Sequence, residues 1–194
     1  MKSALTAGGA RGKDSKKNMN RIILITGGAR SGKSRYAEER ARETGARLLY
    51  VATAEAGDDE MSQRIAAHCA RRGDEWTTIE APVEIARAVR ENRGFDAAVV
   101  DCVTLWLSNL VERADDTAIE RAVEEFIAAV RGFDAPAFIV TNELGSGIVP
   151  ENALARRFRD LAGRTNQRLA EAADEVVLMV AGLPIFAKKG GTCG

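Results

Sequence analysis

Short apolar runs alternate with longer amphipathic segments along most of the chain. Apolar runs with the length of buried strands cover residues 22–25, 48–52, 97–100, 137–140 and 175–180. Helical spacing of apolar residues predicts helices over residues 34–43, 82–93, 119–130 and 154–173, and gives 61–72 helical character. This alternation predicts a mostly parallel α/β sheet with helices on both faces. We expect the run at 175–180 to be the last strand, followed by a turn at 182–184.

The length of 194 residues is sufficient for one domain with a sizeable core. Residues 1–20 are basic and polar, and we predict a disordered N-terminal extension there. The folded domain is expected over residues 21–189. The glycine-rich segment 190–194 is predicted to be a flexible tail.

Charge and cysteine usage narrow the functional classes. The 28 basic and 28 acidic side chains balance, so no overall charge attracts nucleic acid or an anionic membrane. No apolar run approaches the roughly 20 residues that span a bilayer, and we expect no membrane insertion. The three cysteines are widely spaced without a CxxC pair, which predicts neither a zinc site nor a disulfide framework. The pattern is consistent with a reducing cytoplasm, and Cys102 in its apolar surroundings is predicted to be buried.

The sequence GGARSGKS at 27–34 matches the phosphate-loop (P-loop) pattern G-x-x-x-x-G-K-[ST] between a predicted strand and a predicted helix. The predicted nucleotide-binding residues of this loop are Gly27, Gly28, Ala29, Arg30, Ser31, Gly32, Lys33 and Ser34. Its glycines allow backbone N–H groups to surround an anion, and the following helix adds a partial positive charge. The Lys33 ammonium would contact the terminal phosphates, and the Ser34 hydroxyl would bind Mg²⁺. A similar glycine-rich stretch at 8–13 has no strand before it and is discounted.

Asp101 ends the apolar run at 97–100. P-loop proteins commonly place an acid at the end of a neighbouring strand, where it holds Mg²⁺ directly or through water. Asp101 is therefore a predicted metal-binding residue together with Ser34. The alternative is a strand-end aspartate that caps the next turn.

His68 is the only histidine of the chain. A single histidine is commonly structural, but this one follows the second predicted strand, whose carboxyl end should lie beside the P-loop. Nearby arginines at 64, 71 and 72 are suited to binding anions, although a solvated helix face is the alternative explanation. A neutral imidazole is a competent nucleophile toward an α-phosphate. His68 and Lys33 are the predicted catalytic residues.

Several further segments carry a family resemblance. They are GGARSGKS at 27–34, YVATA at 50–54, DDEMSQRIAAH at 58–68, VVDCVTLWLSNL at 99–110 and TNELGSGIVPENALARRFRDLAGRTNQRLAEAADEV at 141–176, with Trp76 and Glu80 at fixed distances beyond the histidine. Together they resemble the bifunctional adenosylcobinamide kinase / adenosylcobinamide-phosphate guanylyltransferase family of cobalamin biosynthesis. The resemblance covers roughly residues 21–188.

The resemblance implies two reactions, a RecA-like P-loop NTPase fold and a homotrimer. In the first reaction a corrinoid, adenosylcobinamide, is phosphorylated by ATP or GTP. In the second, GMP passes from GTP to that phosphate through a guanylylated histidine, which is His68 here. Beyond the P-loop, the family's nucleotide contacts correspond to Ala52, Thr53, Ala54, Cys69, Ala70, Arg71, Arg72, Glu80 and Asp101. Glu80 would bind guanine or ribose, its alternative being a solvated surface acid.

Two other functions remain compatible with the residues. One is a plain small-molecule P-loop kinase in which His68 is structural. The other is a nucleotide-dependent binding module, which requires loops that respond to the γ-phosphate; the sequence shows no recognisable switch signature. Six polar residues of the 141–176 segment could bind the corrinoid, form a subunit interface or satisfy backbone groups at loop and helix ends: Asn142, Glu143, Asn152, Arg156, Arg159 and Asn166. Trp76 and Trp106 are predicted to be packing residues.

Overall fold

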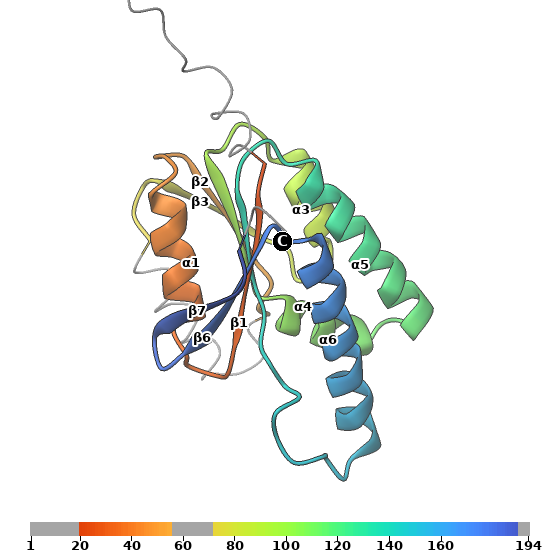
Figure 1. Cartoon of the computed structure of the whole chain (residues 1–194). Coiled ribbons are helices and arrows are strands. Elements are labelled where there is room, and N and C mark those ends of the chain that lie inside the picture. Colours follow the sequence, from red (N-terminus) through yellow and green to blue (C-terminus); the bar gives the residue numbers. More distant parts are fainter. Residues whose placement is uncertain (1–19, 56–71, 190–194) are drawn as a thin grey trace, which may run out of the picture.

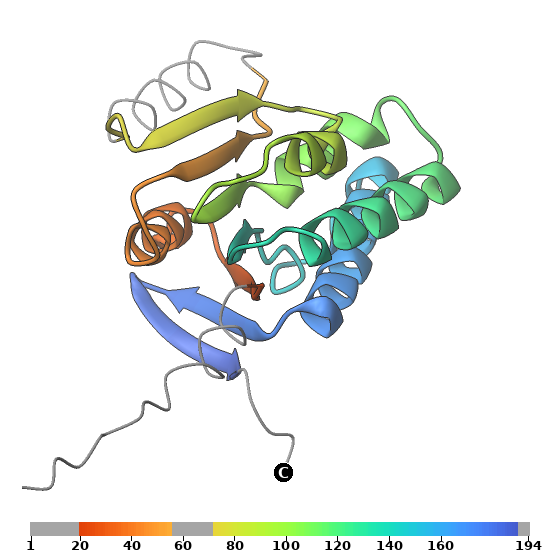
Figure 2. The same cartoon turned by 90° about the horizontal axis from the view of Figure 1, so that it is seen from above.

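The computed structural model describes residues 20–55 and 72–189, which form one seven-stranded sheet flanked by helices (Figure 1). The strand order is β3-β2-β4-β5-β1-β6-β7. The strands are β1 (Ile22–Gly27), β2 (Leu48–Ala52), β3 (Trp76–Glu80), β4 (Ala97–Asp101), β5 (Ala137–Val140), β6 (Glu175–Val180) and β7 (Leu183–Lys188). Their order runs across the molecule when it is viewed from above (Figure 2).

Parallel pairing joins all the strands from β3 to β6, and β7 alone is added antiparallel to β6. Parallel strands require crossover connections, and described helices lie in those from β1 to β2, β3 to β4, β4 to β5 and β5 to β6. β5 pairs with both β1 and β4 and therefore separates the P-loop strand from the strand that ends in Asp101. This order agrees with the RecA-like P-loop fold that the family resemblance implied.

The helices lie on both faces of the sheet (Figures 1 and 2). They are α1 (Lys33–Arg42), α3 (Ile85–Glu91), α4 (Val103–Val111), α5 (Asp116–Arg131) and α6 (Ala153–Ala172). Among the described helices, α1 covers one face, and α3, α4, α5 and α6 cover the opposite face. No helix in the described ranges is long and apolar enough to cross a membrane.

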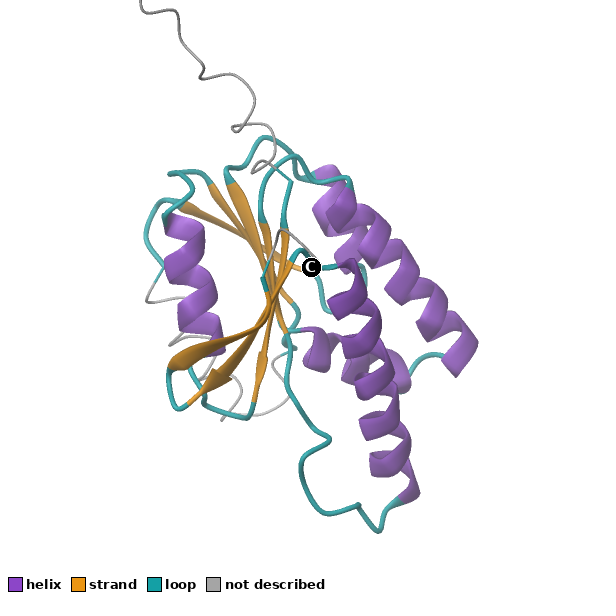
Figure 3. Ribbon diagram, viewed as in Figure 1, coloured by secondary structure: helices purple, strands orange, loops and turns teal. Residues whose placement is uncertain are grey.

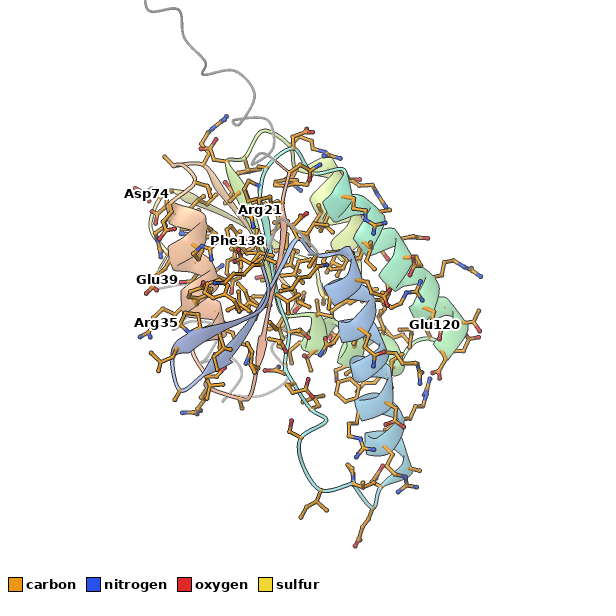
Figure 4. All side chains as sticks on the ribbon, in the orientation of Figure 1. Arg21, Arg35, Glu39, Asp74, Glu120 and Phe138 are labelled. Carbon is orange, nitrogen blue, oxygen red and sulfur yellow. The ribbon has the colours of Figure 1, made fainter. Side chains whose placement is uncertain are left out.

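Alternation along the strands divides the buried side chains between the two faces. Leu49 and Val51 of β2 belong to the cluster that packs on α3, α4, α5 and α6. Leu48 and Tyr50 belong to the cluster beneath α1, with Phe138 of β5. Figure 4 shows Phe138 between α1 and the sheet. Both faces are therefore buried, which explains why the central strands are continuous apolar runs rather than alternating ones.

The predicted strands at 48–52, 137–140 and 175–180 have the same bounds in the structure, and all four predicted helices outside 61–72 exist with shifted ends. Three elements were not predicted: β3, α4 and β7. The expectation that 175–180 is the last strand was wrong, because β7 follows a turn at Ala181 and Gly182. All residues of β7 are exposed, so its sequence shows no pattern of buried apolar residues. Antiparallel pairing with β6 defines this strand.

The carboxyl ends of the parallel strands share one edge of the sheet. The P-loop follows β1 at this edge, and the connection from β5 to α6 extends beyond it as a long loop (Figure 3). Active sites of open α/β sheets lie at this edge. The predicted helix over 61–72 apart from Arg72, the extension over 1–20 apart from Asn20, and the tail over 190–194 lie outside the described residues and remain predictions.

Candidate nucleotide site

The P-loop makes a tight turn between β1 and α1. Gly27 and Gly32 have positive φ angles of 144° and 94°. At Gly27 a Cβ atom would lie 2.5 Å from the carbonyl oxygen of Met179, so β6 leaves no space for a side chain there. Gly182 donates its N–H to the carbonyl of Ser31 at 3.0 Å and holds the loop from the other side.

Helix α1 begins without a side-chain cap. Its N-cap is Gly32, which offers no side-chain acceptor to the first N–H groups. These N–H groups have no partner within the helix, and together with the helix dipole they favour an anion. The predicted phosphate-binding chemistry of residues 27–34 is therefore compatible with the local backbone.

Lys33 folds back onto the loop that carries it. Its ammonium nitrogen donates hydrogen bonds to the carbonyl oxygens of Gly27 and Gly28 at 3.0 and 2.6 Å, and to Ser31 Oγ at 3.4 Å. The side chain is buried, with Lys33 only 7% exposed. Burial lowers the pKa of Lys33 below its ordinary value of 10.5, and the neighbouring Cys102 and Asp101 oppose that shift.

Asp101 at the end of β4 interacts electrostatically with this ammonium. One oxygen of its carboxylate, Oδ2, accepts a hydrogen bond from the Tyr50 hydroxyl at 2.7 Å. Asp101 does not cap the following helix, because the N-cap of α4 is Cys102, whose sulfur accepts from Leu105 N–H at 3.5 Å. The structure therefore does not support the alternative in which Asp101 caps the next turn.

Cys102 is buried, as predicted. Burial and the Asp101 carboxylate raise the pKa of the Cys102 thiol to about 12. The thiol is thus protonated at neutral pH and is not a nucleophile there. Near neutral pH the negative charge that opposes deprotonation of Lys33 comes from Asp101.

Thr53 fastens the end of β2 to the end of β4. Its hydroxyl oxygen accepts from Cys102 N–H at 2.7 Å and donates to the Cys102 carbonyl at 2.8 Å. Its own N–H donates to the Asp101 carbonyl at 3.2 Å, and its carbonyl accepts from Asn109 Nδ2 at 3.0 Å. Thr53 is fully buried. These bonds give Thr53 a positioning role beside Asp101 that sequence reasoning did not identify.

A second polar network fastens the end of β5. Thr141 Oγ1 donates to Asn166 Oδ1 at 2.8 Å, and Asn166 Nδ2 donates to the Asn142 carbonyl at 3.0 Å. Asn142 N–H in turn donates to Thr104 Oγ1 at 2.8 Å. The network ties α4, β5 and α6 together where the long loop begins. The sequence left the roles of Asn142 and Asn166 open, because the members of the network are separated in sequence and meet only in the fold.

The remaining predicted nucleotide-binding residues that the structure describes lie at the carboxyl end of β2, on β3 and in the segment before β3. Ala52 pairs with both Asp101 and Glu80, which puts the ends of β2, β3 and β4 side by side. Ala54 is half-buried, and Glu80 is exposed. Arg72 lies over the ring of Tyr50, with its guanidinium carbon 3.7 Å from the ring centroid. The predicted residues His68, Cys69, Ala70 and Arg71 lie outside the described residues.

A P-loop on a RecA-like sheet, with a buried lysine that interacts electrostatically with a strand-end aspartate, defines the class of P-loop nucleoside-triphosphate-using proteins. A likeness to a solved structure supports the fold alone: the flagellar accessory protein FlaH from Methanocaldococcus jannaschii has a TM-score of 0.52 at 14% identity, over 92% of this chain and 85% of that one. The family model of cobinamide kinase / cobinamide phosphate guanyltransferase matches residues 23–186. This chain therefore belongs to that family of enzymes, as the sequence resemblance implied.

Named relatives agree with this family. The bifunctional adenosylcobalamin biosynthesis protein CobP of Pseudomonas aeruginosa is 44% identical over 84% of this chain and 94% of its own length. The bifunctional adenosylcobalamin biosynthesis protein CobU of Salmonella typhimurium is also 44% identical, over 86% of this chain and 99% of its own length. The similarity covers nearly the whole of both relatives.

Proposed function

We propose that this enzyme phosphorylates the hydroxyl of adenosylcobinamide with ATP or GTP and then transfers GMP from GTP to the resulting phosphate. The products of the second reaction are adenosyl-GDP-cobinamide and pyrophosphate. The observation that carries the proposal is the P-loop with its buried Lys33 next to Asp101, in a chain of the cobinamide kinase family. The corrinoid is thus the expected partner molecule.

The kinase reaction requires an in-line displacement at the γ-phosphorus. The acceptor hydroxyl oxygen forms a bond to phosphorus, the bond to the β–γ bridging oxygen breaks, and the nucleoside diphosphate leaves. The hydroxyl proton is lost to solvent or to a base. Lys33 and the N–H groups at the start of α1 would stabilise the charge on the transferring group and the leaving oxygen.

The guanylyl transfer is proposed to proceed in two steps through His68. An imidazole nitrogen bonds to the α-phosphorus of GTP as pyrophosphate leaves, giving a phosphoramidate. An oxygen of the corrinoid phosphate then bonds to the same phosphorus as the P–N bond breaks, which regenerates the histidine. Splitting the transfer replaces one displacement at the α-phosphorus by two in-line displacements, the first of which uses a neutral nucleophile.

Asp101 and Ser34 provide the hard oxygen donors that Mg²⁺ prefers. No group of three or more His, Cys, Asp or Glu side chains that could hold a metal lies within the described residues. This fits Mg²⁺ that arrives with a nucleotide, because such ions are commonly bound by one or two protein oxygens together with phosphate oxygens and water. When bound, Mg²⁺ would neutralise phosphate charge.

Assembly as a homotrimer is also proposed. Large apolar side chains are exposed on the edge strand β7: Leu183 at 69%, Ile185 at 51% and Phe186 at 40%. An exposed apolar edge strand is a surface that pairs readily with another chain. Light scattering coupled to size exclusion would give three times the mass of the 20.9 kDa chain; a monomer mass would contradict it.

The test of the chemistry is covalent labelling with GTP that carries its label on the α-phosphate. We expect acid-labile, base-stable label on the wild type and none on His68→Ala, and γ-labelled GTP should leave the protein unlabelled. Phosphate transfer from γ-labelled ATP to adenosylcobinamide tests the kinase reaction separately. A folded, GTP-binding wild type that takes no α-label would overturn the histidine mechanism and favour the plain kinase.

A further inference from the structure

We infer that Tyr50 is a positioning residue that orients the Asp101 carboxylate with its hydroxyl and holds Arg72 with its ring face. The inference rests on the proposed binding of a magnesium–nucleotide complex by Asp101. Tyr50 itself is buried, with 3% of its surface exposed, so its action is through these two neighbours.

The strand register puts the phenol in reach of Asp101. Tyr50 pairs with Val99, and Asp101 lies two residues further along β4 on the same face. The hydroxyl donates to Oδ2 of Asp101 at 2.7 Å. The phenol O–H is the donor of this bond, because an ionised carboxylate can only accept. One oxygen of Asp101 is thereby engaged, which restricts the rotation of the carboxylate and leaves Oδ1 for a ligand.

The ring of Tyr50 is fixed from two directions. The Trp76 ring meets it edge to face, with centroids 5.8 Å apart and an interplanar angle of 80°. The Arg72 guanidinium carbon lies 3.7 Å from the centroid, the closest of the cation–ring contacts in the described residues. Arg72 Nη1 also donates to Thr78 Oγ1 at 3.1 Å, and Thr78 is the β3 partner of Tyr50. A cation on a ring face and a hydrogen bond together hold the guanidinium in one place.

The two contacts link a metal-binding acid to an arginine predicted to contact the nucleotide. Arg72 follows the proposed nucleophile His68 by four positions in the sequence. A purely structural Tyr50 would affect the free energy of unfolding and nothing else. A positioning Tyr50 would also change how nucleotide binding depends on Mg²⁺, since partners of a metal ligand commonly alter metal affinity by about 10- to 100-fold.

The chain offers matched controls. Its second tyrosine, Tyr36 on α1, accepts a hydrogen bond from Arg40 Nη1 at 2.8 Å and lies half-buried, so Tyr36→Phe removes the same atom elsewhere. Arg42 lies over the Trp76 ring at 5.5 Å, so Arg42→Gln removes a comparable cation from the neighbouring ring.

The experiment measures binding of a non-hydrolysable GTP analogue as Mg²⁺ is titrated, with thermal unfolding recorded for each variant. We expect Tyr50→Phe to raise the half-saturating Mg²⁺ concentration about 10-fold and Tyr36→Phe to leave it unchanged. Equal Mg²⁺ dependence in the two variants would overturn the role of the hydroxyl.

A second experiment tests the ring of Tyr50. Arg72→Gln should weaken analogue binding in the wild-type and Tyr50→Phe backgrounds but not in Tyr50→Leu, whereas Arg42→Gln should have no effect. An undiminished Arg72→Gln effect in Tyr50→Leu would overturn the role of the ring. Because binding is measured without GMP transfer, a wild type that forms no guanylylated histidine would count against the proposed function only.

Discussion

The ammonium nitrogen of Lys33 lies 2.6 Å from the carbonyl oxygen of Gly28, within the loop that is expected to bind phosphate. A backbone carbonyl is a weaker partner for an ammonium than a phosphate oxygen, because the phosphate carries a full negative charge. Nucleotide binding should therefore draw Lys33 from these carbonyls toward the phosphates.

Replacing Lys33 by methionine should abolish most of the activity while the fold survives. Loss of one preorganised charge at a reacting phosphate is expected to slow phosphate transfer about 100-fold or more. Stability should change little, since a buried ammonium also carries a desolvation cost. Arg35→Ala on the outer side of α1, where Arg35 pairs with Glu39 across 3.7 Å, is the control for loss of a cation (Figure 4). A Lys33→Met enzyme with the rate of Arg35→Ala would contradict the role of Lys33.

The lowered pKa of Lys33 predicts a pH dependence with a definite sign. Between the lowered folded pKa and the ordinary value of 10.5, the unfolded chain binds more protons at this group than the folded chain. The contribution of Lys33 to the free energy of unfolding therefore rises with pH across this window. Nucleotide binding, which needs the charged ammonium, should weaken over the same window. Calorimetric titrations of wild type and Lys33→Met from neutral pH upward would test this, and parallel binding curves for the two proteins would contradict it.

Gly27→Ala should destabilise the fold by about 2 kcal/mol or more, because the new methyl meets the Met179 carbonyl at 2.5 Å and the backbone has a φ of 144°. Gly28→Ala is the stability control, since a Cβ there meets nothing within 4 Å. Thermal unfolding of the two variants measures the difference. Equal melting temperatures would contradict this prediction and show that β6 shifts to accommodate a methyl group at Gly27.

Thr53→Val should cost about 1–3 kcal/mol of unfolding free energy, because the Cys102 N–H loses its buried acceptor without any change in side-chain shape. The substitution should also slow nucleotide transfer, since the same hydroxyl fixes the residue after Asp101. Thr77→Val on the exposed side of β3 is the matched control and should stay within about 0.5 kcal/mol. Denaturant unfolding measures the free energy of unfolding of both variants. A Thr53→Val protein as stable as Thr77→Val would refute the positioning role.

Local sequence was sufficient for the P-loop and for most of the elements around it. The pattern at 27–34 combines glycine, lysine and serine at the spacings that a phosphate-binding loop requires. The strand before it and the helix after it follow from hydrophobic periodicity. The central strands β2, β5 and β6 were predicted with their observed bounds, because residues buried on both faces leave a continuous apolar run. The family also followed from the sequence, through long segments rather than the P-loop alone.

Pairing between distant segments decided the rest. β3 and β7 lie at the two edges of the sheet, where exposed residues remove the hydrophobic signal and hydrogen bonds to one neighbour define the strand. The contacts of Tyr50 with Asp101 and of Thr53 with Cys102 span about 50 positions of sequence and arise because parallel pairing of β2 and β4 puts their carboxyl ends together. By itself the sequence determined which residues can bind phosphate, because that chemistry depends on residue type and short spacing. Only the tertiary structure decided which groups hold those residues in place, because that depends on register and packing between strands far apart in the chain.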